Sequence, residues 1–215
     1  RHMVIDPSGR GADETAVCIA STAGALIYVH ELTGWDGGYN DVVLEKIAKM
    51  CVEYEVSLVR IESNFGDGLF SKVITPVLLD YCGRIGIEEF KVTGRKETRM
   101  LETLEPVTSA HRLVWDRRVA KDEKNQMQFT RLTDSRGALK HDDRVDALAS
   151  AVEYYKDLMA INVDKAAQDN RQKRWEETVE SWASDFRASD WISHSGAIRE
   201  LNKKKTKPRK SQWGW

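Results

Sequence analysis

Apolar, β-branched runs alternate with amphipathic stretches along the first three quarters of the chain. The runs predict five strands, at residues 3–6, 15–22, 26–32, 57–61 and 87–92. A turn at Ala23-Gly24 joins the second run to the third, so we expect the first three strands to form an antiparallel meander. The run that ends on Glu62 is typical of a strand covered on both faces.

Apolar residues three and four positions apart predict the helices, at residues 41–54, 69–81, 96–108, 121–132 and 140–158. Asn40 or Asp41 is suited to cap the first of them, and the second is expected to continue through Pro76. Residues 112–115 predict a short extended piece. This order of elements predicts an α/β fold with a mixed sheet of about five strands, the first three antiparallel, flanked by helices.

The composition changes near residue 160, which predicts two regions, 1–158 and 159–215. The second region is polar and charged and contains five of the seven tryptophans. Residues 203–210 carry six basic side chains in eight positions. We interpret the second region as a helical extension that becomes a disordered basic tail.

Charge and cysteine content narrow the class of protein further. The formal net charge is −1, so attraction of nucleic acid has to come from local patches. The three cysteines are far apart in apolar runs and predict buried free thiols in a reducing compartment. No stretch of about 18 apolar residues is present, which excludes a membrane span.

The candidate chemistry lies at three acidic positions along the chain. Asp6 and Glu62 each end a predicted strand, and a cluster of Asp142, Asp143 and Asp146 opens the last predicted helix. Carboxylates brought together from two strand ends and a helix repel one another unless a cation neutralises them. Hard oxygen ligands of this kind suit Mg²⁺ or Mn²⁺ and can support phosphodiester hydrolysis by two metal ions.

Each acidic position also has a structural explanation. Asp6 before Pro-Ser-Gly is ordinary turn chemistry, and Glu62 would be satisfied by a salt bridge. Acids at a helix N-terminus are favoured by the helix dipole. On a helical wheel Asp142 and Asp146 flank the apolar stripe while Asp143 lies opposite it, so the spacing leaves open which aspartate binds metal.

Longer motifs around these acids resemble a known family. The motifs are residues 6–11, 62–68, 103–106 and 137–148, and they occur in order over residues 3–158. They resemble the nuclease domain of tailed-phage large terminase subunits, most closely the T7-like branch. The resemblance implies a ribonuclease H/RuvC-like fold. It also implies an endonuclease that cuts concatemeric double-stranded viral DNA during genome packaging.

The resemblance also implies which residues act. Asp6, Glu62 and an aspartate of the cluster would bind two Mg²⁺ or Mn²⁺ ions, with Asp6 between them. We favour Asp143 as the catalytic third ligand, with Asp142 and Asp146 as further candidates. RuvC-like resolvases end in a similar motif and would favour Asp143 and Asp146 together.

Basic residues near the acids are candidates for contacts with DNA phosphates. Lys96 and Arg99 share one helix face, and the other candidates are Arg10, Lys140 and Arg144. For each of them, a solvated surface position is the alternative. His141 is a candidate for proton transfer, or for a helix-capping or solvent-facing role.

The family resemblance predicts the partners as well. These are double-stranded DNA, the portal protein, the small terminase subunit and an N-terminal ATPase motor of the same polypeptide. The printed sequence has no Gly-x-x-x-x-Gly-Lys-[Ser/Thr] phosphate loop and begins almost directly on a strand, so we expect it to be the nuclease half alone. The expected location is the host cytoplasm, outside the mature virion.

Two other classes of protein remain open. Residues 6–11, followed by 13–15, also resemble the first phosphate loop of sugar kinases and actin-like ATPases, although 215 residues are few for two such lobes. A catalytically inactive module that docks to a portal is the third possibility. Metal-dependent DNA cleavage distinguishes the nuclease from both.

Overall fold

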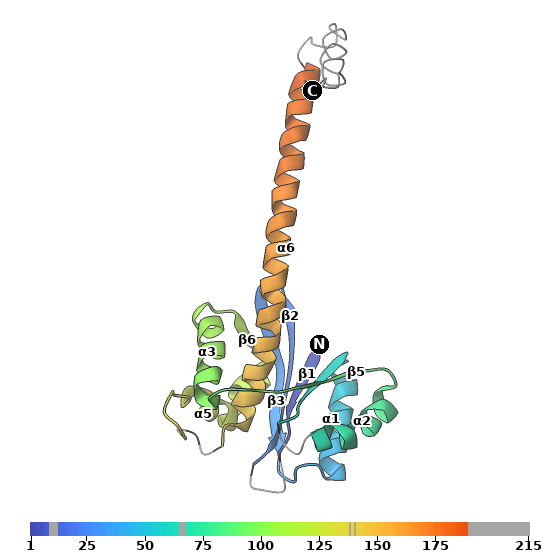
Figure 1. Ribbon diagram of the computed structural model, residues 1–215, viewed down its shortest axis with the longest axis vertical. Coiled ribbons are helices and arrows are strands. Elements are labelled where there is room, and N and C mark those ends of the chain that lie inside the picture. The colour runs from blue at the N-terminus through green and yellow to red at the C-terminus, as the bar shows by residue number, and fades with distance from the viewer. Residues whose placement is uncertain (9–12, 65–67, 138, 140, 189–215) are drawn as a thin grey trace, which may run out of the picture. The chain divides into compact units, whose positions relative to one another are not determined.

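The computed structural model describes residues 1–8, 13–64, 68–137, 139 and 141–188 of the chain. The chain divides into two compact units, Arg1–Ala160 and Ile161–Trp215. Figure 1 shows the elements of the first unit arranged around a central sheet. Among the described residues, no helix is both long enough and apolar enough to cross a membrane.

The sheet has six strands in the order β5-β4-β1-β2-β3-β6. The strands are β1 His2–Asp6, β2 Thr15–Ala23, β3 Leu26–Trp35, β4 Leu58–Glu62, β5 Gly86–Phe90 and β6 Leu113–Trp115. The first three are antiparallel neighbours, whereas β4, β5 and β6 pair in parallel. The predicted mixed sheet is therefore confirmed, and the short extended piece is its sixth strand, paired with β3.

Six helices are present among the described residues. They are α1 Asp41–Glu53, α2 Leu69–Cys82, α3 Lys96–Ser109, α4 Arg117–Lys121, α5 Glu123–Thr130 and α6 Asp143–Ala188. Asn40 caps α1 by accepting a hydrogen bond from the Val43 amide at 2.9 Å. The helix predicted at 121–132 is α5, which is shorter than expected, and the short helix α4 before it was not predicted. Asp122 ends α4 and caps α5 with its side chain. Helix α6 begins three residues later than predicted.

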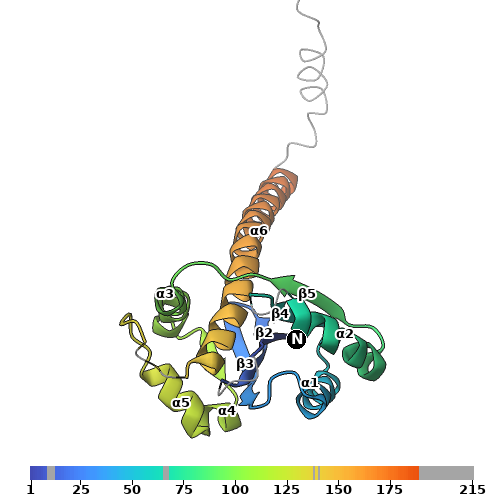
Figure 2. The same ribbon diagram turned by 60° about the horizontal axis from the view of Figure 1, so that its bottom comes forward.

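Alternation along the strands divides the apolar residues between the two faces of the sheet. Met3, Ile5 and Val17 pack with the buried residues of α1 and α2. Val4 and Cys18 lie on the opposite face and pack with the buried residues of α3 and α6. Figure 2 shows these helix pairs on opposite sides of the sheet. Complete burial of one large apolar side chain stabilises such a fold by about 1.5–3 kcal/mol.

Strand β4 differs from its prediction. Only Val59 and Ile61 are buried, whereas Leu58, Arg60 and Glu62 are half-buried. The strand is therefore fully covered on the α1–α2 face alone. The partly covered face, which looks toward α6, carries the polar residues and leaves them accessible to a ligand.

Helix α6 continues through residues 161–188 in the second unit, where a helical extension was expected. The basic stretch at 203–210 lies outside the described residues. All three cysteines are free thiols, with Cys18 and Cys51 buried and Cys82 half-buried. Burial raises the pKa of the Cys18 and Cys51 thiols, which makes both poor nucleophiles.

His2 makes the stability of the first unit depend on pH. Its ring lies against those of Tyr154 and Tyr155, with centroids 4.6 and 4.2 Å away, and neither ring nitrogen has a hydrogen-bond partner among the described residues. Burial, together with the nearby Arg60 charge, lowers the pKa of His2 from 6.5 to about 3. Below pH 6.5, His2 therefore binds a proton in the unfolded chain but stays neutral in the folded chain.

We expect the free energy of unfolding to lose about 2 kcal/mol through His2 between pH 8 and pH 5. His2→Phe removes this titration and should flatten the urea-denaturation profile over that range. His111→Asn is the control, because His111 is exposed and its left-handed backbone conformation suits asparagine. Equal pH profiles for the wild-type chain and His2→Phe would contradict the prediction.

Candidate metal centre

Two of the predicted acids lie side by side at one edge of the sheet. Strands β1 and β4 are parallel neighbours, and Ile5 pairs with Ile61. Asp6 and Glu62 are the next residues of the two strands, so their side chains leave the sheet on the α6 face, at the carboxyl ends of both strands. Open α/β sheets bind ligands at this edge.

The first turn of α6 supplies the third carboxylate. The Asp146 amide donates a hydrogen bond to the Asp142 carbonyl at 2.9 Å, which closes this turn. One oxygen from each of Asp6, Glu62 and Asp146 lies within 4.8 Å of the others. The structure thus brings together all three acidic positions. We call these three residues the carboxylate cluster.

Asp143, which we favoured as the third ligand beside Asp6 and Glu62, lies in a different group of side chains. Its carboxylate accepts a hydrogen bond from the Glu14 amide at 3.3 Å. It forms a second possible metal-binding group with Asp13 and His141, whose ligand atoms also lie within 4.8 Å of one another. Because Asp143 is the first residue of α6, it faces the loop before β2, whereas Asp146 faces the strand ends. The geometry favours Asp146 as the third member of the carboxylate cluster.

The electrostatics of the carboxylate cluster favour protonation of its acids or a bound cation. Burial, together with the charges of Asp146 and Glu62, raises the pKa of Asp6 well above its usual value. Burial and the charge of Asp146 also raise the pKa of Glu62, and burial raises that of Asp143. Protonation or a bound cation relieves such repulsion, and an all-oxygen donor set is the kind that Mg²⁺ and Mn²⁺ prefer.

Two side chains of α3 contact the acids of α6. The Lys96 ammonium lies 2.8 Å from the Asp142 carboxylate and 3.0 Å from that of Asp146. Although burial alone would lower it, the charges of Asp146 and Asp142 raise the pKa of Lys96. Arg99 also pairs with Asp146 and donates to the Ser150 hydroxyl. Lys96 and Arg99, predicted to hold DNA phosphates, therefore lie within the site and contact its acids.

The Arg144 side chain is buried and bonded to other side chains of the protein. Its guanidinium pairs with the Glu14 carboxylate at 2.9 Å and also donates to Asp122 and Asn125, each at 3.1 Å. The side chain is only 9% exposed. Because its donors are used inside the protein, we leave Arg144 out of the DNA-contacting set.

The remaining predicted residues are placed as follows. His141 lies with its Nδ1 atom 3.5 Å from the Asp13 carboxylate. Arg10 and Lys140 lie outside the described residues, so their roles stay predictions. Sequence reasoning missed Glu14 and Asn125, which bind Arg144. A glutamate directly before a buried β-branched run was the signal available for Glu14.

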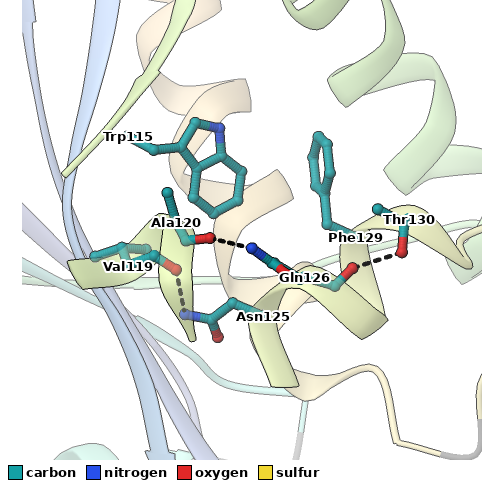
Figure 3. Close-up of a pocket in the computed structure, with 7 residues that line it drawn as sticks. All are labelled: Trp115, Val119, Ala120, Asn125, Gln126, Phe129 and Thr130. Carbon is teal, nitrogen blue, oxygen red and sulfur yellow. Dashed lines mark hydrogen bonds between the residues drawn. The ribbon is translucent and has the colours of Figure 1, made fainter. Parts of the chain in front are cut away.

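A small apolar cavity elsewhere in the fold is not the chemical centre. Figure 3 shows its lining residues. The ring centroids of Trp115 and Phe129 are 5.1 Å apart. Its volume is about 160 Å³, and its polar side chains already bond to nearby backbone, such as Gln126 to the Ala120 carbonyl at 2.5 Å. The lining has no charged residue, so Trp115 serves packing here.

Fold and site together define a ribonuclease H-like domain with a carboxylate centre at the ends of its parallel strands. Residues 5–113 match the family described as Terminase Bacteriophage T7, Ribonuclease H-like domain. The chain belongs to this family, which confirms the resemblance seen in the sequence. It is also 40% identical over 195 residues to the terminase large subunit of Enterobacteria phage T3, covering 84% of this chain and 33% of that protein. The chain thus spans about a third of the length of this relative.

A solved structure supports the fold. A mutant of the large terminase subunit of bacteriophage Sf6, solved with calcium, superposes with a TM-score of 0.50 at 13% identity, covering 70% of this chain and 87% of that one. The fowlpox virus resolvase with Holliday junction DNA is similar with a TM-score of 0.45 at 13% identity, covering 73% of this chain and 99% of that one. The predicted ribonuclease H-like fold is confirmed.

Proposed function

We propose that this domain is a metal-dependent endonuclease that cuts concatemeric double-stranded phage DNA during genome packaging. The observation that carries the proposal is the convergence of Asp6, Glu62 and Asp146 from two strand ends and a helix, with ligand oxygens within 4.8 Å of one another. Membership of the terminase ribonuclease H-like family supports the same activity. The kinase interpretation of residues 6–11 has no comparable support.

The metal ions in this proposal are Mg²⁺ or Mn²⁺, two per site. Asp6, Glu62 and Asp146 would hold them, and Asp142 and Asp143 would support the site from outside its direct ligands. Bound there, the metal supplies Lewis acidity toward a phosphodiester and lowers the pKa of a water nucleophile. The residues of the chain hold oxygen ligands at the open sheet edge, where a strand of DNA can approach.

The α3 cations have a positioning role in this proposal. Lys96 contacts both Asp142 and Asp146, and Arg99 contacts Asp146, so the two cations limit the rotation of both carboxylates. Their positive charge also lies where a phosphate of the scissile strand would approach. With a net charge of −1 the domain is expected to bind DNA weakly by itself.

The cellular setting completes the proposal. In this proposal the domain lies beside an ATPase motor in a longer polypeptide, and the family relationship and the 40% identical, longer T3 relative support this setting. In that polypeptide it would work with the portal protein and the small terminase subunit, in the host cytoplasm. Docking to the portal without catalysis is the competing function.

The test is cleavage of a supercoiled plasmid by the chain with millimolar Mn²⁺ or Mg²⁺, followed on agarose gels. We expect nicked and linear products that EDTA abolishes. Asp6→Asn should reduce the rate by about a thousandfold, because loss of a metal ligand removes several kcal/mol of transition-state stabilisation. Asp80→Asn, on the exposed face of α2, is the matched control and should cleave normally. Cleavage by Asp6→Asn at the wild-type rate would refute the assignment.

ATP turnover separates the nuclease from the kinase-like alternative. The proposal predicts no change in plasmid cleavage on addition of ATP and no ATP hydrolysis by the chain. Hydrolysis of ATP that depends on Asp6 would support the alternative.

A further inference from the structure

A polar cavity opens on the α6 face of β4. It lies beside the carboxylate cluster but is formed by different residues. Its volume is about 210 Å³. The lining includes the cations Arg60, Lys91 and Arg99 and the Ser150 hydroxyl, with Glu153 as the opposing carboxylate. The lining thus carries a surplus of positive charge, whereas the neighbouring cluster is acidic. A cavity of this charge attracts an anion.

Arg60 is fixed in this cavity by aromatic rings. Its guanidinium carbon lies 4.6 Å from the centroid of Phe90 and 4.5 Å from that of Tyr154. The side chain is only 18% exposed, and cation–π contacts of this kind hold a guanidinium plane in one orientation.

The donors of Arg60 are unused within the described part of the chain. Its guanidinium makes no hydrogen bond there, and its Nε atom is buried without a partner. The Glu88 carboxylate is 3.6 Å from Nε and is itself 57% exposed. A fixed guanidinium with free N–H donors can form two parallel hydrogen bonds to the oxygens of a phosphate group.

Residues of β4, α3 and α6 link the cavity to the carboxylate cluster. Arg60 lies two residues before Glu62, on the same face of β4. Asp146, Ser150 and Tyr154 recur every four residues along one side of α6, over a length of about 12 Å. Arg99 contacts both Asp146 and Ser150, so it links the cluster to the cavity. A nucleic-acid strand that crosses the acids therefore runs past Arg60.

We propose that this cavity, with Arg60 as its anchor, binds a backbone phosphate of the DNA strand that is cut at the carboxylate cluster. The inference rests on the proposed nuclease function and adds the site that sets the position of the strand. The ligand chemistry is a phosphate group. A free phosphate ion shares that chemistry, so the experiment includes both sources.

The first measurement is binding of a fluorescent DNA duplex of about 20 base pairs by anisotropy, in EDTA, at several salt concentrations. Arg60→Gln should weaken binding about tenfold at low salt, as expected for loss of a charged hydrogen bond. The slope of log affinity against log salt should fall by about 0.9, the value for one phosphate contact. Arg118→Gln is the matched control, because Arg118 is 70% exposed and pairs with Asp116. Equal affinity and slope for Arg60→Gln and the wild-type chain would overturn the proposal.

The second measurement records binding by the wild-type chain and uses a conservative variant only to assign one resonance. In the wild-type chain labelled with ¹⁵N-arginine, the Nε resonance of Arg60 is identified by its absence in Arg60→Lys. We expect this resonance to shift on addition of the duplex and to remain in place with millimolar inorganic phosphate. A shift with phosphate and none with the duplex would make the cavity a site for a free anion and would overturn the DNA assignment.

The proposed nuclease function and this inference can fail separately. Both binding measurements exclude metal, so they do not require cleavage. Plasmid cleavage that needs Asp6 but is indifferent to Arg60, together with unchanged DNA affinity, would retain the nuclease and remove the phosphate site.

Discussion

Asp146→Asn is expected to reduce metal-dependent plasmid cleavage by about a thousandfold, as much as Asp6→Asn, because both remove an oxygen ligand of the same ions. Asp143→Asn should cost about 10- to 100-fold, the range for residues that support a metal site from outside its direct ligands. The ranking follows from geometry, since Asp146 lies with Asp6 and Glu62 whereas Asp143 bonds to the Glu14 amide. Rates at saturating Mn²⁺ and Mn²⁺ affinity from calorimetry measure both effects.

Asp142→Asn is the matched control for this comparison. Asp142 shares the Lys96 contact of Asp146 but lies outside the carboxylate cluster, so its variant tests the loss of that ion pair alone. We expect it to cleave within about tenfold of the wild-type chain. If Asp143→Asn lost activity as completely as Asp6→Asn while Asp146→Asn remained active, Asp143 would be the third ligand, as we first favoured.

Most of the fold was predictable because its determinants are local or periodic. The strands around Ile5 and Ile61 follow from apolar, β-branched runs, and the antiparallel meander follows from the short turn at Ala23-Gly24. The sixth strand was seen only as an extended piece. Its pairing with β3 over three residues, between Leu113 and Trp115, depends on tertiary contacts that no local pattern encodes.

The candidate site was predictable in its members but not in its arrangement. Asp6 and Glu62 follow from their positions at strand ends. The choice among Asp142, Asp143 and Asp146 depends on where α6 begins and how it is rotated against the sheet. A helical wheel gives the angles between these side chains but not the direction of the sheet. The Arg99 contact with Asp146 and the Glu14 bond to Asp143 settle that rotation in the structure.

The environment of the basic residues was even harder to predict from the sequence than that of the acids. The sequence analysis grouped Lys96 and Arg99, which share one helix face, with Arg144, which flanks the acids, as candidate phosphate contacts. The structure separates them, since Arg144 is buried among hydrogen-bond partners while Lys96 remains partly exposed. Proximity in sequence cannot distinguish a cation that neutralises buried acids from one that faces a ligand.

The buried network around Arg144 joins three parts of the first unit. Glu14 precedes β2, Asp122 and Asn125 belong to the α4–α5 junction, and Arg144 lies in the first turn of α6. Gly34 of β3 makes room for the network, because a Cβ atom there would lie 2.8 Å from a Glu14 carboxylate oxygen. Lys124 also pairs with Glu14 at 2.7 Å but is 36% exposed.

Arg144→Met is expected to lower the free energy of unfolding by about 3 kcal/mol, because removing one partner of a buried ion pair leaves the Glu14 charge with only the partly exposed Lys124 as a partner. Most of this loss should be recovered in the double variant Glu14→Gln, Arg144→Met, which removes that charge as well. Urea denaturation at pH 7 measures the free energies, and the four-protein cycle gives the coupling between the two residues. Lys124→Met is the control for the exposed pair and should cost about 1 kcal/mol or less.

The pH dependence gives an independent check on the same ion pair. Against the opposing effect of burial, hydrogen bonds from Arg144 and Lys124 lower the pKa of Glu14 below 4.5. Its contribution to stability is therefore present above pH 4.5 and is lost as the pH falls through the folded pKa. In Arg144→Met this acid-side loss should shrink, so the stability curves of variant and wild type converge toward low pH. Parallel curves would show that the pair does not stabilise the charged form of Glu14. Because Arg144 lies between Asp143 and Asp146, the variant should also loosen the first turn of α6 and weaken Mn²⁺ binding.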